Sequence, residues 1–487
     1  MGETVGTSGL IFNEALLWEK SRPGRCGFSV PRRDVPEAPL VAELVGEPPH
    51  LPELAEPDVV RHYTRLSQWN VAVDTAMYPL GSCTMKYNPK LHDRLATLPG
   101  LAGSHPLLPQ KLAQGALQLM FELEGYLAEI TGMDAVSLQP SAGAQGEFTG
   151  LMLIEAHHRS RGERRTKVIV PDTAHGTNPA SAALCGYQPV PVRSDERGVL
   201  CSDAVAAVMD EDVAGIMVTN PNTLGLFEEN LPQIAEAVHA KGGQVYCDGA
   251  NLNALMGVVQ LGELGVDVMH TNLHKTFSTP HGGGGPGAGP VCVKSHLEPF
   301  LPVPRVVRCE TTAKYSLDYD RPGSIGKVHA FYGNFGVLVR AYCYILSMGG
   351  GGLKRASQLA VLNANYLKER LRDVLHLPYD RPCMHECVFT DRQQRAHKIS
   401  TLDMAKRLID LGFHPPTIYF PLVVDGAIMI EPTETESKDT LDAFVEAFRV
   451  VAAEAETHPE RLRAAPTLPK VTRLDEVAAA RKPCLRG

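Results

Sequence analysis

The sequence has few aromatic residues, no long apolar run and no excess of positive charge. Aromatic residues make up 6% of the 487 positions, and only 2 of them are tryptophan. Because no apolar stretch is long enough to cross a bilayer, membrane insertion is not expected. Lys and Arg number 47 against 55 Asp and Glu, which gives a formal net charge of -8. A chain with this acidic balance and no basic stripe is not expected to bind nucleic acid.

Regular cysteine spacing and a leader-like segment are also missing. The 11 cysteines are an odd number scattered without a repeated spacing, which is typical of free thiols in a reducing compartment. Cys383 and Cys387 bracket His385, but no second pair stands at zinc-site spacing, so no metal is expected. Residues 1–6 lack the basic and apolar regions of a signal peptide. We therefore expect a cytoplasmic protein.

The composition is that of an ordinary globular protein, in a chain that is too long for a single core. Hydrophobic residues are 44% and charged residues 21% of the sequence. Residues 1–60 are rich in proline and arginine, and their scattered apolar residues favour an arm that wraps over a partner surface. We predict a large cofactor-binding domain over residues 61–330 and a smaller α+β domain over residues 331–487.

Helical and strand patterns alternate between residues 110 and 295. A helical apolar stripe runs from Leu112 to Leu127. The expected strands are 167–171, 214–219, 244–250, 266–270 and 289–293. Such alternation predicts an α/β fold with a mostly parallel sheet that helices cover on both faces.

The C-terminal part changes character. Helical patterns dominate to about residue 375, and short apolar strand patterns follow at 387–389, 422–424 and 428–430. A final helix is predicted because its apolar residues recur at three- and four-residue steps. These residues are Leu441, Phe444, Val445, Phe448 and Val451.

The most informative pair of residues is Asp248 followed by Lys275. Lys275 comes just after an apolar strand, in an uncharged and glycine-rich setting, where desolvation favours the nucleophilic free amine. Asp248 ends the preceding strand pattern, where a carboxylate can partner the ring nitrogen of pyridoxal phosphate (PLP). Alone, each residue is more often a solvated loop residue or a helix cap. Their order on successive strand ends favours a PLP site, because ligands bind at that edge of a doubly wound sheet.

Other strand ends supply groups that fit the same cofactor. Residues 139–147 combine small residues with Ser141 ahead of a helix expected from Phe148, and such a start can bind a phosphate. His175 follows the next strand and could stack on a ring and carry protons, although a structural histidine is the plainer interpretation. The polar turn 219–223 could reach the phenolic oxygen of the cofactor, or it could be an ordinary turn.

Gly282, Gly284 and Gly287 match the spacing of a dinucleotide-binding fingerprint. That motif must follow a strand and open a helix. Here proline residues and then a strand pattern follow, so we reject a dinucleotide site. The glycines more plausibly allow close backbone approach near Lys275 or to a neighbouring subunit.

Taken together, these motifs resemble the P-protein family, the glycine decarboxylases of the glycine cleavage system. The resemblance is to the PLP-carrying subunit of the two-subunit bacterial form, and it covers nearly the whole chain. The segments that carry it are 78–86, 139–147, 173–181, 272–276, 281–287, 384–386 and 431–438.

The resemblance implies a fold-type I, aspartate aminotransferase-like PLP enzyme. It implies that Lys275 forms the Schiff base with PLP, that Asp248 partners the pyridine nitrogen and that His175 stacks on the ring. The phosphate would lie on Ser141, Ala142 and Gly143. Further cofactor contacts would come from Asn220, Ala250 and His274. Tyr78, Ser82, His281 and Glu386 are plausible groups on the substrate side, without assigned roles.

The same resemblance implies the activity and the partners. Glycine would be decarboxylated, and the remaining aminomethyl group would pass to the lipoyl arm of the H-protein. A companion subunit 1 is implied because the chain matches only half of the one-chain enzyme, and we predict a two-plus-two heterotetramer.

Two other interpretations remain open on the sequence alone. Another fold-type I enzyme, such as an aminotransferase or amino-acid decarboxylase, commonly clamps a substrate carboxylate with arginine. No arginine stands in a motif that we can assign to that duty. A cofactor-free scaffold subunit is the other possibility, but the presence of Lys275, Asp248 and His175 weakens it.

Overall fold

The computed structural model describes residues 14–29, 31–38, 40–47, 49–282, 285–469 and 471–484. The chain divides after Thr75 into two compact units. The helical segments of the first unit are α1 (Leu17–Lys20), the 3-10 turn η1 (Ala42–Leu44) and α2 (Glu56–Ser67). Glu14 joins α1 to α2, since its carboxylate contacts Lys20, His62 and Arg65. The predicted arm therefore contains helical segments, and its first 13 residues lie outside the described part. The predicted boundaries at residues 60 and 330 stay predictions.

The second unit, residues 76–487, is built on a seven-stranded sheet with the order β1-β7-β6-β5-β4-β2-β3. The strands are β1 (Ala135–Ser137), β2 (Lys167–Pro171), β3 (Gln188–Val192), β4 (Val213–Thr219), β5 (Gln244–Gly249), β6 (Val268–Thr271) and β7 (Val291–Val293). All pairings from β3 through β6 are parallel, and β7 is antiparallel to both of its neighbours. The predicted strands and the mostly parallel sheet are confirmed.

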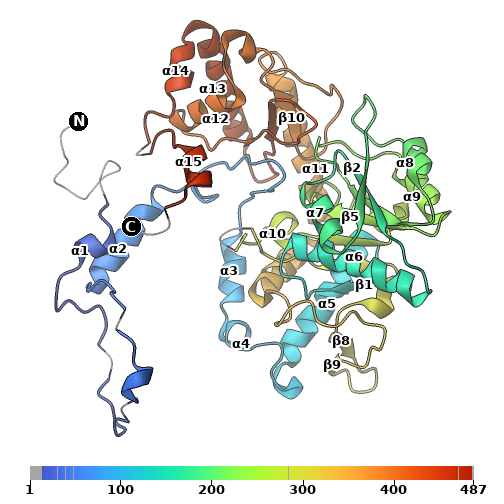
Figure 1. The fold of residues 1–487 in the computed structure, drawn as a ribbon, viewed down its shortest axis with the longest axis horizontal. Helices are drawn as coiled ribbons and strands as arrows, with labels where there is room; N and C mark the ends of the chain where they lie inside the picture. The colour runs from blue at the N-terminus through green and yellow to red at the C-terminus, as the bar shows by residue number, and fades with distance from the viewer. Residues whose placement is uncertain are drawn as a thin grey trace. The chain divides into compact units, whose positions relative to one another are not determined.

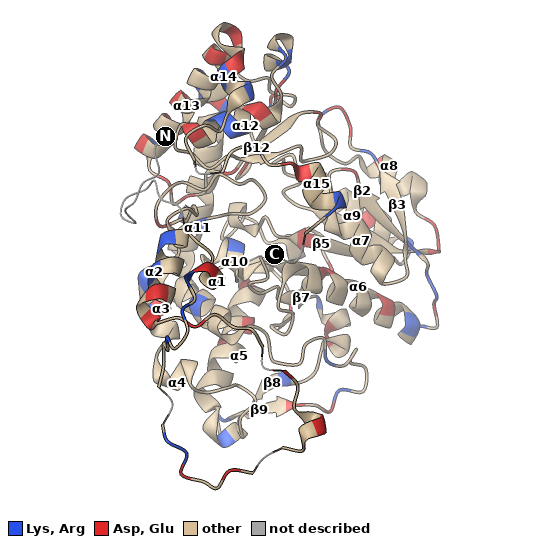
Figure 2. Cartoon of the chain, turned by 60° about the vertical axis from the view of Figure 1, so that its left-hand side comes forward, with Lys and Arg blue, Asp and Glu red and all other residues tan. Residues whose placement is uncertain are grey.

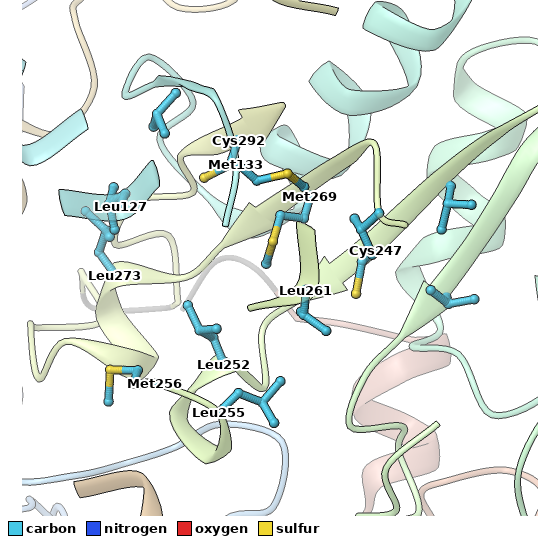
Figure 3. Close-up of a cluster of buried hydrophobic side chains, with 14 of the residues drawn as sticks. Leu127, Met133, Cys247, Leu252, Leu255, Met256, Leu261, Met269, Leu273 and Cys292 are labelled. Atoms are coloured by element: carbon cyan, nitrogen blue, oxygen red, sulfur yellow. The ribbon is translucent and has the colours of Figure 1, made fainter. Parts of the chain in front are cut away.

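Alternate residues of these strands face two separate apolar cores, as expected for a sheet covered on both faces. In β2, Ile169 belongs to one core while Val168 and Val170 belong to the other. In β6, Met269 and Val268 divide in the same way. Figure 3 shows the core that contains Met269, Cys247 and Leu273, into which the segment after β6 also packs.

Helices cover both faces of the sheet, and Figure 1 shows α5, α6 and α7 close to it. The helices of this part of the chain are α3 (Lys90–Ala96), α4 (Pro99–Ala102), α5 (Gln114–Thr131), α6 (Gly143–Ser160), α7 (Thr177–Leu184), α8 (Ser202–Val208), α9 (Leu231–His239) and α10 (Leu273–Thr276). The 3-10 turns and the short hairpin are η2 (Gln110–Leu112), η3 (Leu252–Ala254), η4 (Leu261–Leu264), η5 (Ser295–Phe300), β8 (Arg305–Arg308) and β9 (Tyr315–Asp318). The predicted helical stripe is confirmed except at Leu112, which precedes α5 and is 65% exposed.

The C-terminal part has its own sheet and its own core. Its elements are α11 (Phe335–Leu371), β10 (Cys387–Thr390), η6 (Gln394–His397), α12 (Thr401–Asp410), β11 (Thr417–Ile418), β12 (Ala427–Ile430), α13 (Lys438–Thr457), α14 (Pro459–Ala464) and α15 (Glu476–Arg481). The three strands pair antiparallel in the order β10-β12-β11. The predicted apolar face of α13 is buried in this core.

One predicted strand, 422–424, is wrong. These residues form turns, and Leu422 is 84% exposed. Pro421 provides no backbone N–H for a strand ladder, and Val424 N–H instead donates to Pro421 O across the turn.

Charged residues of both signs are mixed on the C-terminal helices. Figure 2 shows blue and red segments together on α13 and α14. Among the described residues, no helix combines the length and the apolar character needed to cross a membrane.

Candidate active site

The residues predicted to bind the cofactor ring lie at the carboxyl ends of neighbouring parallel strands. Thr219 at the end of β4 pairs with Asp248 in β5, and Asp248 pairs with His270 in β6. Asn220 follows β4 directly, and Lys275 lies in α10, a few residues beyond β6. This is the edge at which open parallel sheets bind ligands. We call Asn220, Asp248, Lys275 and the segments beside them the strand-end wall.

Asp248 is an ionised carboxyl in a fully buried setting. Burial alone would raise the pKa of Asp248, but electrostatic interactions with His270, His175 and Lys275 and the hydrogen bond from Ala250 hold it below its usual value. Asn178 Nδ2 donates to Asp248 Oδ2 at 3.1 Å, and the N–H of Ala250 donates to Oδ1 at 3.0 Å. Ala250 therefore serves Asp248 through its backbone, which its residue type did not reveal.

A histidine and a tyrosine form a chain of contacts that ends on Asp248. His270 Nε2 lies 3.4 Å from Asp248 Oδ1, and Tyr246 Oη lies 2.5 Å from His270 Nδ1. Both side chains are buried. The pattern of strand residues marked Tyr246 and His270 only as core positions, so this chain of contacts was missed.

Lys275 is half-buried in α10, which begins after Asn272. The neighbouring Leu273 is fully buried in the sheet core and fixes this short helix. Among the described residues, Lys275 Nζ has no hydrogen-bond or ion-pair partner. Its positive charge nevertheless acts on the pKa of Asp248, His281 and Glu386, so Lys275 lies within electrostatic reach of all three.

His175 is oriented by a polar chain that ends on a buried carboxylate. Its Nδ1 lies 2.7 Å from Thr177 Oγ1, and that hydroxyl donates to Glu147 Oε1 at 2.6 Å. Ser181 donates to the other oxygen of Glu147 at 2.9 Å. The charge of His175 reaches Asp248, which places the predicted ring-stacking residue at the same site.

The predicted phosphate cradle lies at the start of a long helix. Helix α6 begins at Gly143, five residues before the predicted start at Phe148, because the small residues after Ala142 allow the chain to enter the helix early. Gly143 packs directly on Asn272, since a Cβ at residue 143 would stand 2.6 Å from Asn272 Oδ1. The first turn of α6, whose N–H groups can bind an anion, therefore lies against the segment that carries Lys275.

Ser141 and His274 have local partners at this site. The N–H and the hydroxyl of Ser141 both donate to Gln145 Oε1, at 2.7 and 2.9 Å. A phosphate bound there would have to compete with Gln145. His274 Nδ1 lies 3.2 Å from both backbone polar atoms of Ala288, and burial lowers its pKa to about 3. Its ring fills the space where Gly287 would carry a Cβ, at 2.2 Å.

The glycine-rich segment does not open a helix. Gly287 is followed by extended chain and then by β7, which confirms the rejection of a dinucleotide fingerprint. Gly284, the middle glycine of the apparent motif, lies outside the described residues.

Several buried polar atoms of the strand-end wall have no partner in the protein. They are Asn220 Nδ2, Thr271 Oγ1, Asn272 Oδ1, Thr276 Oγ1 and Thr279 Oγ1. An unpartnered buried donor or acceptor is costly, and native proteins rarely leave one without a ligand or water. Four of these residues are close to Lys275 in the sequence, and Asn220 follows the neighbouring part of the sheet at the end of β4. A polar cofactor such as PLP therefore fits the residues present.

A second wall was largely missed from the sequence. Ser82 N–H donates to Glu386 Oε2 at 2.7 Å, and Thr84 N–H donates to Glu431 Oε2 at 2.9 Å. His385 Nε2 lies 3.8 Å from Glu431 Oε1. We call Ser82, Thr84, His385, Glu386 and Glu431 the carboxyl wall. Its two hydrogen bonds join residues more than 300 positions apart, and no local pattern could have paired them.

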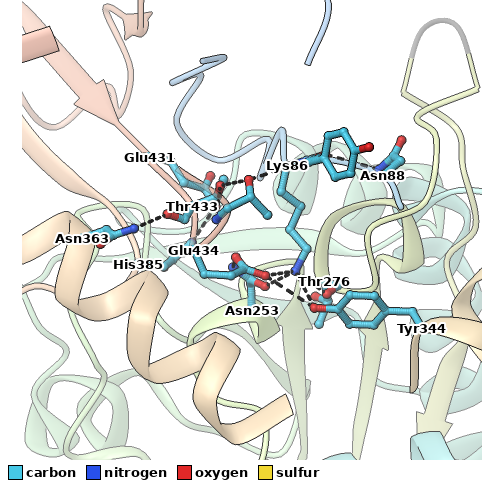
Figure 4. A network of polar contacts seen from close by, with 12 residues as sticks. Lys86, Asn88, Asn253, Thr276, Tyr344, Asn363, His385, Glu431, Thr433 and Glu434 are labelled. Atoms are coloured by element: carbon cyan, nitrogen blue, oxygen red, sulfur yellow. Dashed lines mark hydrogen bonds and ion pairs between the residues drawn. The ribbon is translucent and has the colours of Figure 1, made fainter. Parts of the chain in front are cut away.

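A buried lysine ties the carboxyl wall to the strand-end wall (Figure 4). Lys86 Nζ donates to Thr276 O and Asn253 Oδ1 at 2.8 Å each, and it lies 2.5 Å from Glu434 Oε1. Burial alone would lower the pKa of Lys86, but Glu434 and Tyr344 hold it above its usual value. Since Thr276 directly follows Lys275, this contact fixes the helix that carries the predicted cofactor lysine.

Comparison with known proteins identifies the family. Residues 54–313 match the family described as glycine cleavage system P-protein, and residues 356–465 match the glycine dehydrogenase C-terminal domain. The chain belongs to the glycine cleavage system P-protein family. A relative from Caldanaerobacter subterraneus, named a probable glycine dehydrogenase (decarboxylating) subunit 2, is 57% identical over 97% of this chain and 98% of its own length. A relative of the same name from Halalkalibacterium halodurans is 56% identical over 97% and 98%.

Solved structures give the same fold. A glycine decarboxylase P-protein crystallised in inhibitor-bound form matches with a TM-score of 0.71 and 22% identity, over 85% of this chain and 93% of its own. An aspartate aminotransferase from Thermus thermophilus matches with a TM-score of 0.57 and 16% identity, over 77% and 99%. The predictions of the family and of the fold-type I, aspartate aminotransferase-like fold are confirmed.

Proposed function

We propose that this chain is the PLP-carrying subunit of a glycine decarboxylase. It removes CO2 from glycine and passes the remaining aminomethyl group to the lipoyl arm of the H-protein. The observation that carries the proposal is the placement of Asp248 and Lys275 at the ends of adjacent parallel strands, in a chain of the P-protein family. The relatives named glycine dehydrogenase (decarboxylating) support the choice of glycine.

Each residue of the strand-end wall has a role in this proposal. Lys275 would anchor the cofactor, and Asp248 would partner its ring nitrogen. His175 would stack on the ring, Asn220 Nδ2 would donate to the phenolic oxygen, and Ser141, Ala142 and Gly143 at the start of α6 would hold the phosphate. His274 supports the Lys275 helix from Ala288, and Ala250 supports Asp248.

The bound cofactor supplies a sink for the electron pair that stays on the glycine Cα when CO2 leaves. Asp248 sustains that sink, because its ionised carboxylate favours the protonated ring nitrogen. The contacts from Glu147 through Thr177 would orient the His175 side chain for the ring. The amine of Lys275, at the same strand end, would be placed to hold a proton.

The two alternative interpretations lose support. An aminotransferase or another amino-acid decarboxylase would belong to a different family. A cofactor-free scaffold has no use for the unpartnered polar atoms around Lys275.

The partners and the compartment complete the proposal. The name subunit 2 of the relatives implies a companion subunit, and we propose two copies of each. We place the enzyme in the cytoplasm, because none of the eleven cysteines, all of them among the described residues, forms a disulfide in the structure. The exposed apolar residues of the first 60, among them Trp18 and Phe28, suit an arm that packs on a partner.

The test is to add PLP to the purified chain, record its visible spectrum, reduce it with borohydride and map the labelled peptide. Label on the Lys275 peptide is expected. A protein without an absorption band, or with label on another lysine, would contradict the assignment. Size measurement with and without the companion subunit tests the assembly, and full activity from a homodimer of this chain would exclude the heterotetramer.

A further inference from the structure

The carboxyl wall brings two fully buried acids side by side. Glu386 immediately precedes β10, and Glu431 immediately follows β12. These strands are antiparallel, with Cys387 opposite Ile430, so the two glutamates flank the same end of the pair. Both are 0% exposed. Strand register therefore sets the positions of Glu386 and Glu431. The surroundings of the two side chains must explain why two acids are buried there.

Backbone groups from one turn hold both acids. The N–H groups of Ser82 and Thr84 each donate to one oxygen, and both residues have a positive φ, 61° and 48°. Non-glycine residues rarely adopt that conformation, which is found where a surrounding site enforces it. The turn adopts this less favourable backbone conformation, and in it two N–H groups point at the two carboxyls.

The other oxygens of the pair lack firm partners. Glu431 Oε1 and both ring nitrogens of His385 have none in the described structure, and Glu386 Oε1 has only a 3.5 Å contact with Ser82 Oγ. His385, Glu386 and Glu431 each have one side-chain nitrogen or oxygen atom in a common group, and these three atoms lie within 4.8 Å of one another. A structural cap would leave no such group of unsatisfied buried atoms.

The charges around the pair do not balance two carboxylates. Lys275 is the cation whose charge reaches both acids, while Lys86 is already paired with Glu434. Burial and Lys275 lower the pKa of His385 to about 3, so its ring is neutral. Cys83 and Cys387 are neutral too, since burial raises the pKa of Cys83 to about 11 and contacts with Cys383 raise that of Cys387.

Two neighbouring buried acids beside a single cation share a proton, because both cannot be ionised together. Burial and the charge of Glu431 raise the pKa of Glu386 well above its usual value. Burial raises the pKa of Glu431 to about 7, although Thr84 and Lys275 oppose this shift. At neutral pH the pair therefore carries one proton and can accept another.

We propose that Glu386 and Glu431 form a proton-sharing pair that acts as the base for the substrate amine. An N–H bond of the glycine ammonium group breaks, its electron pair stays on nitrogen, and the proton moves to the ionised oxygen of the pair. The nitrogen lone pair is then free for the displacement of Lys275. The identity of this amine rests on the proposed function, whereas the shared proton does not.

Infrared spectroscopy of the full chain without substrate tests the shared proton. Protonated carboxyls have a C=O stretch distinct from that of carboxylates. We expect Glu386→Gln to lose one such band at neutral pH. Glu431→Gln should lose the same band, because the remaining Glu386 ionises beside Lys275, and the double variant should lose no more than either single one.

A matched control is Glu124→Gln, which removes another buried acid whose pKa burial raises to about 7. It should lose its own band and keep that of the pair. Additive losses from Glu386→Gln and Glu431→Gln, or no loss from either, would overturn the proposal. Should one glutamine variant fold poorly, the difference between the band titrations of the wild type and of the other variant gives the answer, because it removes the contribution of other buried acids such as Glu124.

Turnover of the complete enzyme tests the role as a base. Glu431→Gln should lower the rate of CO2 release from glycine by about 10²–10⁴-fold, which is the usual contribution of a general base. The acidic limb of the kcat/KM profile near pH 7 should disappear, and Glu431→Asp should restore part of the rate. Labelling of Lys275 by PLP should persist, so failure of the proposed function would be visible separately. An unchanged rate and pH profile would refute the pair as the base.

Discussion

The two walls of the site solve the problem of buried charge in opposite ways. In the strand-end wall, interactions with His270, His175 and Lys275 and the hydrogen bond from Ala250 lower the pKa of Asp248, so its carboxylate stays ionised. In the carboxyl wall, Glu386 and Glu431 have one backbone donor each and face one another, so their pKa values rise. Acidic residues thus provide an ionised carboxylate in the strand-end wall and a proton carrier in the carboxyl wall. Surroundings set the chemistry of a buried acid, as in other paired acid–base sites.

The change with the largest expected effect removes the shared centre of both walls. Lys275→Ala should abolish covalent cofactor attachment and glycine decarboxylation, because the neighbouring amine, Lys86, is held by Glu434 and Thr276. The measurement is the absorption spectrum with PLP, together with CO2 release. Lys275→Ala should also raise the pKa of the carboxyl pair, since the charge of Lys275 lowers the pKa of both acids. Turnover in this variant would refute the assignment of the anchor.

Asp248→Asn breaks the strand-end wall and leaves the carboxyl wall intact. The amide keeps the shape but loses the negative charge, and its single oxygen can accept from Asn178 or from Ala250 but not from both. We expect PLP to bind and decarboxylation to slow by at least about 10²-fold, which is typical of losing one preorganised electrostatic contact. Cofactor titration and single-turnover rates separate binding from chemistry. An unchanged rate would move the ring-nitrogen partner elsewhere.

Lys86→Met cuts the link between the walls. It leaves Glu434 buried without its cation, and breaking a buried ion pair on one side costs about 3–5 kcal/mol. We expect a lower Tm and a weaker hold on the helix that carries Lys275. The double variant with Glu434→Gln should recover part of the loss, because the stranded charge is gone. Thermal unfolding of all three variants measures this coupling, and additive losses would mean that the two residues act independently.

The same contrast explains what the sequence could and could not predict. Asp248, Lys275 and His175 each follow a strand whose apolar pattern is local, so their meeting at one edge follows from parallel pairing. Strand 422–424 was wrong because a turn after Pro421 overrides an apolar triplet. The start of α6 was misplaced because glycine and alanine carry weak signals for a helix boundary.

The carboxyl wall could not be predicted in this way. Glu386 and Glu431 meet only because β10 pairs with β12 in one register, and their donors come from a turn around residue 83. Sequence pattern marked His385, Glu386 and Glu431 as parts of notable motifs. Their partnership depends on the tertiary fold.

The smallest expected effect comes from the support behind Asp248. Tyr246→Phe keeps the ring in the core but removes the hydroxyl that lies 2.5 Å from His270 Nδ1. An unpartnered buried nitrogen costs about 1–3 kcal/mol of stability, so unfolding should occur at lower denaturant. Because Asp248 keeps its contacts with Asn178 and Ala250, the rate should fall less than in Asp248→Asn. A rate loss as large as that of Asp248→Asn would mean that Tyr246 controls the charge of Asp248 through His270. The function of Asp248 would then depend on His270 and Tyr246 as well as on the hydrogen bonds from Asn178 and Ala250.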